Sequence, residues 1–469
     1  MNDEELRQEE IYVASLVERA RAAQKEAEKF TQRKVDELAA AIVYKLSRPE
    51  IAGEIAQMAF DEAGMGRVDS KTAKLTQKMP AILYDILSTK TVGIVERIPE
   101  KGITKIAKPL GVIAALVPST NPGATPAFKG VLGLRGRNAV IFAPHPKTKA
   151  TSMRVTEIMR NILVKNGAPA DLFICIDRPS MAVSRELMKQ CDITMATGSA
   201  DMVKAAYSSG KPAYGVGAGN AVVIIDETAD ISATAQKIAV SKTGDNATGC
   251  SAENAVIIQE SVYGEMMKAF QAEGGYLCNT QEKALLQKAM WPDGEHLNRD
   301  IVARPATVIA KIAGITVPSD TQFIMVEENG TGPGYPFSKE KLSVVLAVYK
   351  YNVFEKAIET VNSIQRYSGY GHSCGIHSVN QAHIEQLALS TYTTKVIVRQ
   401  PHGQANAGNW FNGLANTFSL GCGTWGGNIV SENITQKHYF NITWVAEPID
   451  RQPATEAEIY KDLLDNVTL

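Results

Sequence analysis

Residues 111–176 alternate between short apolar segments and amphipathic stretches, and this alternation constrains the fold more than any other feature of the sequence. Strand-like segments at 111–117, 138–142 and 171–176 are separated by helix-like segments at 126–134 and 150–166. Strands and helices that alternate in this way form a parallel sheet covered by helices on both faces. The sequence therefore predicts an α/β fold whose ligands bind at the carboxyl ends of the strands.

A later stretch of the chain repeats this alternation. It begins near residue 233 and includes strand-like segments at 344–348, 371–377 and 395–398. At 469 residues the chain is too long for one hydrophobic core. We therefore expect two α/β units, and long amphipathic helices in residues 11–46 that pack onto one of them.

Two segments stand apart from this alternation. Residues 91–108 carry apolar side chains on both sides of Pro99-Glu-Lys-Gly102, a pattern typical of two strands joined by a turn. We expect a projecting hairpin there. Residues 439–446 form the last strand-like stretch, which would pair with the hairpin or with a neighbouring subunit.

Composition excludes several classes of partner. With 49 basic and 50 acidic residues, no overall field draws the chain to nucleic acid or to an anionic membrane. The first ten residues are acidic and polar, and no apolar run reaches the roughly 18 residues needed to span a bilayer. We expect a soluble, cytoplasmic protein. Its six cysteines lack CxxC pairs, and the spacing of His372, Cys374 and His377 is not a zinc pattern, so we expect free thiols and no metal site.

The most informative segment is residues 243–258, a loop rich in small residues that contains Cys250 and runs into an apolar strand. A thiol beside small residues can be approached by a carbonyl carbon, and a nearby positive charge would favour its thiolate. Most single cysteines are buried and inert, and we interpret Cys175 in that way. Cys250 is the candidate nucleophile.

The stretch Asp245-Asn-Ala-Thr-Gly-Cys250-Ser-Ala-Glu253 resembles the nucleophile motif of the aldehyde dehydrogenase superfamily, and in particular its coenzyme A-acylating branch. Six further stretches match the family in the family's order: Lys108-Pro-Leu-Gly-Val112, Pro118-Ser-Thr-Asn-Pro122, Ala143-Pro-His-Pro-Lys147, Ala196-Thr-Gly-Ser199, Tyr214-Gly-Val-Gly-Ala-Gly-Asn220 and Lys339-Glu-Lys-Leu342. Together they extend over most of the chain.

The resemblance implies an aldehyde dehydrogenase-like α/β fold with two parallel-sheet domains and a β-hairpin oligomerisation arm. Residues 1–232 would form a dinucleotide-binding domain, interrupted by the arm at about 91–108, and residues 233–424 a catalytic domain. Residues 425–469 would form a C-terminal return with an oligomerisation strand at about 439–447. The arm implies a homodimer or homotetramer.

The resemblance also implies a thioester mechanism. The Cys250 thiolate attacks an aldehyde, and the Cys250 N–H and the Asn121 amide stabilise the resulting oxyanion. Hydrolytic members carry a Glu before paired glycines as the base that activates water, whereas the matching stretch here begins with Val216. Because valine cannot accept a proton, we expect the acyl group to pass to coenzyme A, although Glu253 or His372 could serve as another base.

For the dinucleotide, residues 215–220 contain no G-x-G-x-x-G, so the ordinary Rossmann fingerprint is absent. The resemblance implies a variant site, with a helix N-terminus facing the pyrophosphate. NAD and NADP both remain open, because the Lys147 cation could accept a 2′-phosphate. The expected cofactor-binding residues are Thr120, His145, Lys147, Thr197, Gly198, Ser199, Gly219 and Glu340.

The substrate is expected to be a short anionic aldehyde, with sulfoacetaldehyde ahead of succinate semialdehyde. Arg399 could bind its carboxylate or sulfonate, although a surface ion pair is an equal alternative for this residue. His402 follows closely, and His372 lies in a glycine-rich turn that could approach the acyl group or coenzyme A. The competing hypotheses are a hydrolytic aldehyde dehydrogenase and a catalytically silent scaffold with the same fold.

Overall fold

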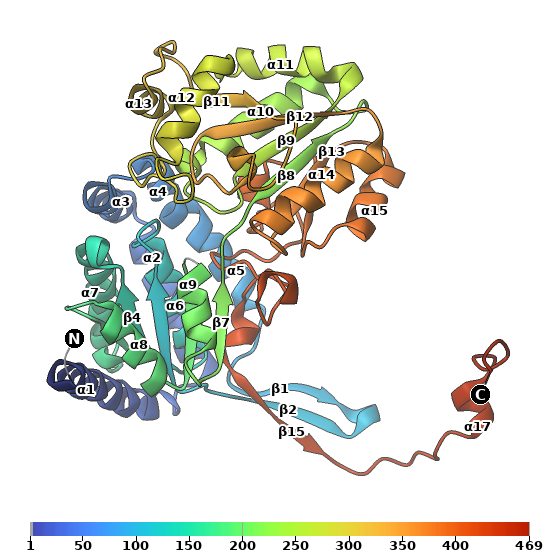
Figure 1. Cartoon of the computed structure of the whole chain (residues 1–469). Helices are drawn as coiled ribbons and strands as arrows, with labels where there is room; N and C mark the ends of the chain where they lie inside the picture. The colour runs from blue at the N-terminus through green and yellow to red at the C-terminus, as the bar shows by residue number, and fades with distance from the viewer. Residues whose placement is uncertain (1–2, 199, 469) are drawn as a thin grey trace.

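The computed structural model describes residues 3–198 and 200–468, which form two α/β lobes and a projecting arm (Figure 1). Each lobe is built around its own parallel sheet, and each sheet has its own buried apolar cluster. The expectation of two parallel-sheet units with a hairpin arm is therefore confirmed. No helix in the described part of the chain is both long and apolar enough to cross a membrane.

The first lobe contains a five-stranded parallel sheet in the order β5-β4-β3-β6-β7. Its strands are β3 (Val112–Val117), β4 (Ala139–Pro144), β5 (Phe173–Cys175), β6 (Ile193–Thr197) and β7 (Ala213–Val216). The helices of this lobe are α1 (Asp3–Ala27), α2 (Gln32–Leu46), α6 (Ala124–Arg135), α7 (Lys149–Lys165), α8 (Met181–Gln190) and α9 (Ala200–Tyr207). The strands and helices predicted in residues 111–176 are all present, although β5 is only three residues long.

The second lobe contains a seven-stranded sheet in the order β10-β11-β12-β9-β8-β13-β14. Its strands are β8 (Ala221–Ile225), β9 (Glu253–Gln259), β10 (Gly275–Leu277), β11 (Phe323–Glu327), β12 (Val345–Tyr351), β13 (Cys374–His377) and β14 (Val396–Val398). Its helices are α10 (Ile231–Thr243), α11 (Tyr263–Ala272), α12 (Thr280–Met290), α13 (Ala306–Ala313), α14 (Phe354–Tyr367), α15 (Gln381–Ser390) and α16 (His402–Ala405).

The strand β8 changes where the chain is best divided. It pairs with β9 on one side and β13 on the other, in the middle of the second sheet. A boundary at residue 233 would separate β8 from the sheet to which it belongs. We therefore propose that the second unit begins before Ala221 rather than at residue 233.

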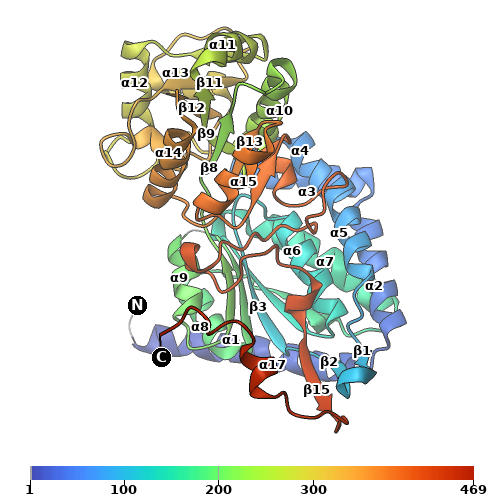
Figure 2. The same ribbon diagram turned by 90° about the vertical axis from the view of Figure 1, so that its right-hand side faces the viewer.

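A helical segment of the first half of the chain reaches the second lobe. The helix α3 (Pro49–Ala63) is followed by α4 (Val68–Ala73), a π-helical turn η1 (Lys74–Lys78) and α5 (Met79–Leu87). In both ribbon views α4 lies where the lobes meet (Figures 1 and 2), and it contacts the 3-10 turn η5 (Gly244–Ala247) that precedes the nucleophile. Isolated π-helical turns are frequent at functional sites, so this junction is a natural place to look for one.

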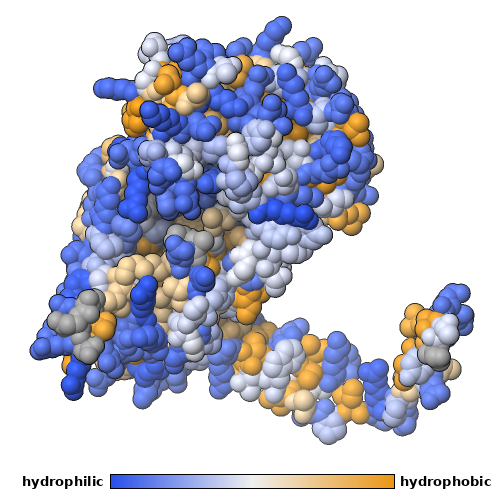
Figure 3. All heavy atoms as spheres, viewed as in Figure 1, coloured by the Kyte–Doolittle hydropathy of each residue, from blue (hydrophilic) through white to orange (hydrophobic). Residues whose placement is uncertain are grey.

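The arm consists of β1 (Gly93–Ile98), β2 (Ile103–Lys108) and β15 (Asn441–Ala446) in one antiparallel sheet. The late strand pairs with the hairpin, as the first of the two alternatives predicted. It begins at Asn441 because residues 436–439 form a 3-10 turn in which Tyr439 is buried against the first lobe. Apolar side chains, including Trp444 and Ile94, stay exposed along the arm (Figure 3), which continues to the short helix α17 (Glu456–Tyr460).

Candidate active site

The nucleophile loop, defined here as residues 244–252, joins α10 to β9. Three consecutive non-glycine residues in it, Asp245, Asn246 and Ala247, have positive φ angles of 48°, 50° and 58°. A left-handed conformation costs roughly 1–2 kcal/mol for each such residue, so surrounding contacts must hold this loop in place. The loop presents Cys250, which is partly accessible.

His372 is the polar partner of Cys250. Its Nε2 lies 3.1 Å from Cys250 Sγ, and its Nδ1 lies 2.8 Å from Ser373 Oγ, which also accepts a hydrogen bond from Asn406 Nδ2 at 2.9 Å. Burial lowers the pKa of His372 to about 3, so this imidazole is neutral. Burial, reinforced by the charge of Glu340, raises the pKa of Cys250 to about 12. The resting pair is therefore a thiol beside a neutral imidazole.

Gly219 and Glu340 complete this side of the site. The Gly219 N–H donates to Glu340 Oε1 at 3.1 Å. A Cβ on Gly219 would lie 2.2 Å from the Cys250 carbonyl oxygen and 2.9 Å from the His372 ring, so only glycine fits at this position. Burial raises the pKa of Glu340 to about 8, which leaves this carboxyl largely protonated at neutral pH.

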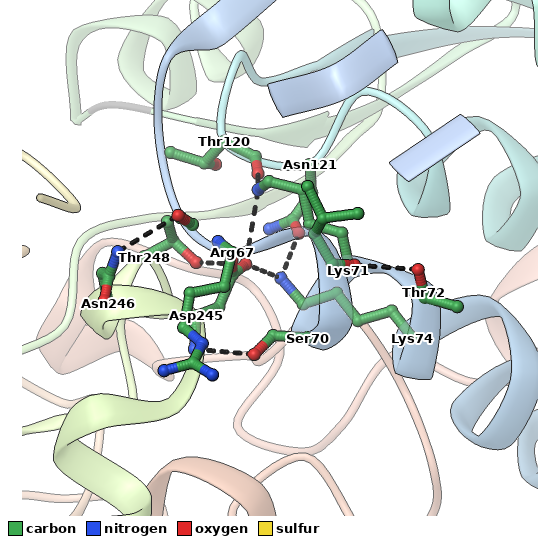
Figure 4. Close-up of polar contacts among 12 residues, drawn as sticks. Arg67, Ser70, Lys71, Thr72, Lys74, Thr120, Asn121, Asp245, Asn246 and Thr248 are labelled. Carbon is green, nitrogen blue, oxygen red and sulfur yellow. Dashed lines mark hydrogen bonds and ion pairs between the residues drawn. The ribbon is translucent and has the colours of Figure 1, made fainter. Parts of the chain in front are cut away.

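Asn121 lies on the opposite side, in the turn between β3 and α6, beside two lysines and an aspartate (Figure 4). Lys74 Nζ donates to Asn121 Oδ1 and to Asp245 Oδ2, both at 2.5 Å. Lys71 Nζ donates to the Thr120 carbonyl at 3.2 Å and lies 3.4 Å from Asp245 Oδ2. These contacts connect the predicted oxyanion donor to the nucleophile loop through residues of α4 and η1.

Asp245 is the centre of this group. Besides the two lysines, its carboxylate accepts hydrogen bonds from the Arg67 N–H and from Thr248 Oγ1, each at 2.7 Å. Burial acts to raise the pKa of Asp245, but the charges of Lys74 and Lys71 and their hydrogen bonds outweigh it and hold the pKa below its usual value. The Asp245 carboxylate thus clamps the left-handed loop to the first lobe.

The residues predicted for the dinucleotide fall into two groups. Thr120, His145, Lys147, Thr197 and Gly198 follow the carboxyl ends of β3, β4 and β6, three adjacent strands of the first sheet. The chain reverses its direction of strand addition between β3 and β6, which is where open α/β sheets bind ligands. Gly219 and Glu340 instead lie beside Cys250, while Ser199 lies outside the described residues.

This arrangement fits a dinucleotide. His145 and Lys147 are exposed at the end of β4, and Lys147 Nζ donates to the Ala63 carbonyl at 3.0 Å. The absence of a side chain at Gly219 lets residues 215–220 pack directly against the Cys250 carbonyl oxygen and the His372 ring, which brings this stretch beside the nucleophile. The first group would hold the phosphates and adenosine ribose, and the second the nicotinamide end.

Two of the residues predicted for substrate do not reach the thiol. His402 is buried, and its ring nitrogens lie 2.7 Å from the Ser251 carbonyl oxygen and 3.3 Å from that of Cys374, so it fixes backbone behind the nucleophile loop. Arg399 is exposed and donates to the Ser378 carbonyl at 2.6 Å. Because a strand rises about 3.3 Å per residue, Ser378 is on the order of 15 Å from Ser373, at the far end of β13.

Lys395 was not predicted from the sequence. It is largely buried, and its Nζ donates to the Gly421 carbonyl at 3.2 Å and to Thr394 Oγ1 at 3.1 Å. Burial lowers its pKa, while Cys422 and Cys250 act in the opposite sense. Glu432 also acts to raise the Lys395 pKa, and among the described residues no carboxylate lies within ion-pair distance of the Lys395 ammonium.

Asp226, Glu227 and His383 are the one group of described residues whose ligand atoms lie close enough together for a metal ion. Asp226 already accepts hydrogen bonds from His383 Nδ1 at 2.9 Å and from Thr228 Oγ1 at 2.6 Å. The protein's own donors therefore satisfy this carboxylate.

Known proteins resemble this chain over most of its length. The model of the aldehyde dehydrogenase family matches residues 6–277. A sulfoacetaldehyde dehydrogenase of Acholeplasma sp is 42% identical over 97% of this chain and 95% of its own length. An acetylating succinate-semialdehyde dehydrogenase of Clostridium kluyveri is 38% identical over 92% of this chain and 95% of its own length.

A solved structure shows the same architecture. The crystal structure of an acetylating aldehyde dehydrogenase from Geobacillus thermoglucosidasius superposes with a TM-score of 0.92 at 38% identity, covering 96% of this chain and 99% of that one. The chain therefore belongs to the aldehyde dehydrogenase family, and the enzyme class expected from its motifs is confirmed.

Proposed function

We propose that this protein oxidises an aldehyde with NAD(P)⁺ and coenzyme A to the acyl-coenzyme A, through a thioester on Cys250. The observation that carries the proposal is the Cys250–His372 pair at 3.1 Å. Val216, which stands where hydrolytic members of the family carry a Glu, is a buried residue at the end of β7 and cannot act as a base. The Clostridium kluyveri relative and the Geobacillus thermoglucosidasius structure are both named as acetylating enzymes, which supports the same activity.

The first half-reaction begins with the Cys250 proton. His372 is neutral and its Nε2 faces the sulfur, so it is placed to accept this proton. Because burial makes the imidazole a weak base and the thiol a weak acid, the proton transfer accompanies the attack of sulfur on the aldehyde carbon and does not precede it. The carbonyl electrons move onto oxygen, where the Cys250 N–H and the Asn121 amide stabilise the oxyanion. A nicotinamide held beside Gly219 and Glu340 would supply the hydride acceptor that conversion of the hemithioacetal to the thioester requires.

The second half-reaction releases the acyl group. The coenzyme A thiol attacks the thioester carbon after losing its proton, and the same donors stabilise the second tetrahedral oxyanion. The C–S bond to Cys250 then breaks and returns the enzyme thiolate. Between the two halves His372 releases the Cys250 proton to solvent, which is the proton set free in the overall oxidation. The neutral imidazole can then accept the coenzyme A proton and return it to the Cys250 thiolate.

We further propose a short anionic aldehyde as substrate, with sulfoacetaldehyde ahead of succinate semialdehyde. The two named relatives act on these aldehydes at 42% and 38% identity to this chain. Lys395 and the Lys71–Lys74 pair provide positive charge beside the nucleophile loop. Arg399, at the far end of β13, is not needed for this proposal.

The cofactor and the assembly follow from two exposed features. Lys147 supplies a cation at the end of β4, where a 2′-phosphate would lie, so both NAD⁺ and NADP⁺ are proposed as cofactors.

The apolar side chains along the arm, such as Trp444 at 58% exposure, favour burial against another subunit, and we propose a homodimer or homotetramer.

One experiment tests the activity. NAD(P)H formation is followed with sulfoacetaldehyde and with succinate semialdehyde, each with and without coenzyme A and with either dinucleotide. We expect turnover to depend strictly on coenzyme A and to be faster with sulfoacetaldehyde. Equal rates without coenzyme A would replace the proposed acyl transfer by hydrolysis.

A further inference from the structure

We infer that Lys74 is a positioning residue for the oxyanion site, because it fixes the Asn121 amide with its NH₂ group turned away from the lysine. This inference rests on the proposed function, since it concerns the oxyanion formed in both half-reactions. Lys74 is contributed by η1, far from both Asn121 and Asp245 in the sequence, and its ammonium contacts both side chains (Figure 4).

The orientation of the amide follows from the chemistry of lysine. An amide has an oxygen that only accepts hydrogen bonds and an NH₂ group that only donates, whereas an ammonium has only donors. Asn121 must therefore turn Oδ1 toward Lys74 Nζ, as the 2.5 Å contact shows. Its NH₂ group is then directed to the other side, and within the described residues it donates no hydrogen bond. It is free to donate to an oxyanion.

The position of Lys74 is in turn set by Asp245. The same ammonium donates to Asp245 Oδ2, so the amide, the lysine and the nucleophile loop are linked by two consecutive hydrogen bonds. The side chain of Asp245 is only 6% exposed, which protects these contacts from water. Lys74 thereby holds the Asn121 amide in a fixed position relative to the loop that carries Cys250.

The local charge adds to this effect. Two lysines share a single aspartate, and Lys71, whose side chain is 6% exposed, has its pKa lowered to about 8 by burial and by the charge of Lys74. When both lysines are protonated, two positive charges therefore face the single negative charge of Asp245. Because the Lys74 ammonium donates to Oδ1, its charge polarises the Asn121 amide and makes the NH₂ group a stronger donor to an oxyanion.

Lys71 provides a matched control. It approaches the same Asp245 oxygen, but its other contact is the backbone carbonyl of Thr120 rather than the Asn121 amide. Lys71→Met and Lys74→Met thus remove the same charge from the same aspartate, and only Lys74→Met frees the amide to rotate. The comparison separates amide orientation from the clamp on the loop.

The test measures two reactions of Cys250 in each variant. Aldehyde oxidation with coenzyme A forms oxyanions, whereas alkylation of the thiol by iodoacetamide does not. We expect Lys74→Met to lower kcat by about 10-fold to 100-fold, less than the roughly 100-fold to 1,000-fold loss on deleting an oxyanion donor. The alkylation rate should stay within about twofold of wild type, and Lys71→Met should lower kcat by less than Lys74→Met.

A double variant completes the design. If Lys74 acts through the amide, Asn121→Ala with Lys74→Met should lose no more activity than Asn121→Ala alone. Additive losses, a parallel loss of alkylation, or an equal loss in Lys71→Met would each overturn the inference. Wild type is measured before any variant. If it shows no turnover that depends on coenzyme A, the proposed function is wrong, whatever the variants show.

Discussion

The two sides of the active site are built in different ways. The Cys250 side draws on the second lobe, where Cys250, His372 and Glu340 contact one another or Gly219 around the start of β9. The Asn121 side draws on the β3–α6 turn, on η1 and on Asp245 of the nucleophile loop. The first side carries the covalent chemistry and the second arranges charge around it. Chemistry and charge placement therefore respond differently to mutation.

The largest expected effect is on the Cys250 side. Cys250→Ala removes the sulfur that forms the thioester, and no described cysteine takes the same place beside His372. We expect NAD(P)H formation to fall to the limit of detection, while the unfolding temperature stays near that of wild type because the thiol is partly accessible. More than trace turnover would remove the thioester mechanism.

The next effect concerns the imidazole. His372→Ala removes the group that accepts the Cys250 proton, and general base catalysis is worth about 100-fold to 10,000-fold. His377→Ala is the matched control, because His377 ends β13, which begins two residues after His372, and is also buried but contacts Thr234. The measurement is kcat for both variants. Equal losses would show that a buried histidine matters only for packing here.

On the Asn121 side the expected effect is on stability. Asp245→Ala leaves Lys71 and Lys74 without their shared carboxylate and releases the left-handed loop, and breaking a buried ion pair costs about 3–5 kcal/mol. Thermal unfolding of this variant is compared with Asp69→Ala, which breaks an exposed pair with Arg67 worth about 1 kcal/mol or less. Similar unfolding temperatures would show that Asp245 does not clamp the loop.

This contrast also decides what could be predicted from the sequence. Cys250 and Asn121 lie in continuous motifs, and the alternation of strands and helices places those motifs at strand ends, so these residues could be named beforehand. Lys71 and Lys74 lie on an amphipathic helical segment, where lysines are usually solvated, and only the packing of α4 against η5 brings them to Asp245. No local pattern records that contact.

The same reasoning explains the residues that were placed differently. Arg399 and His402 both follow β14 closely in sequence, but they reach different places. Arg399 contacts the backbone at the far end of β13, and His402 contacts the backbone behind the nucleophile loop. Likewise, β8 has an apolar sequence that suits either sheet, and only its pairing with β9 and β13 assigns it to the second lobe. Such non-local pairing cannot be deduced from the alternation alone.

The smallest expected effect is a dependence on pH that links the thiol to Glu340. Burial penalises the thiolate and raises the pKa of Cys250 to about 12, so its alkylation by iodoacetamide without dinucleotide should rise roughly tenfold per pH unit from 7 to 9. Glu340, with a pKa of about 8, is mostly protonated below that pH and negatively charged above it. Its charge then opposes the thiolate.

Wild type and Glu340→Gln should therefore alkylate at similar rates below about pH 8, and the variant should become a few-fold faster above it. Mass spectrometry of the peptide that carries Cys250 gives the rate for this thiol alone, with Cys250→Ala as the blank. A plateau in the wild-type rate below pH 8 would mean that Lys395 or His372 stabilises the thiolate before substrate binds. In that case activation would precede binding, and the Cys250 side would place charge as well as carry the chemistry.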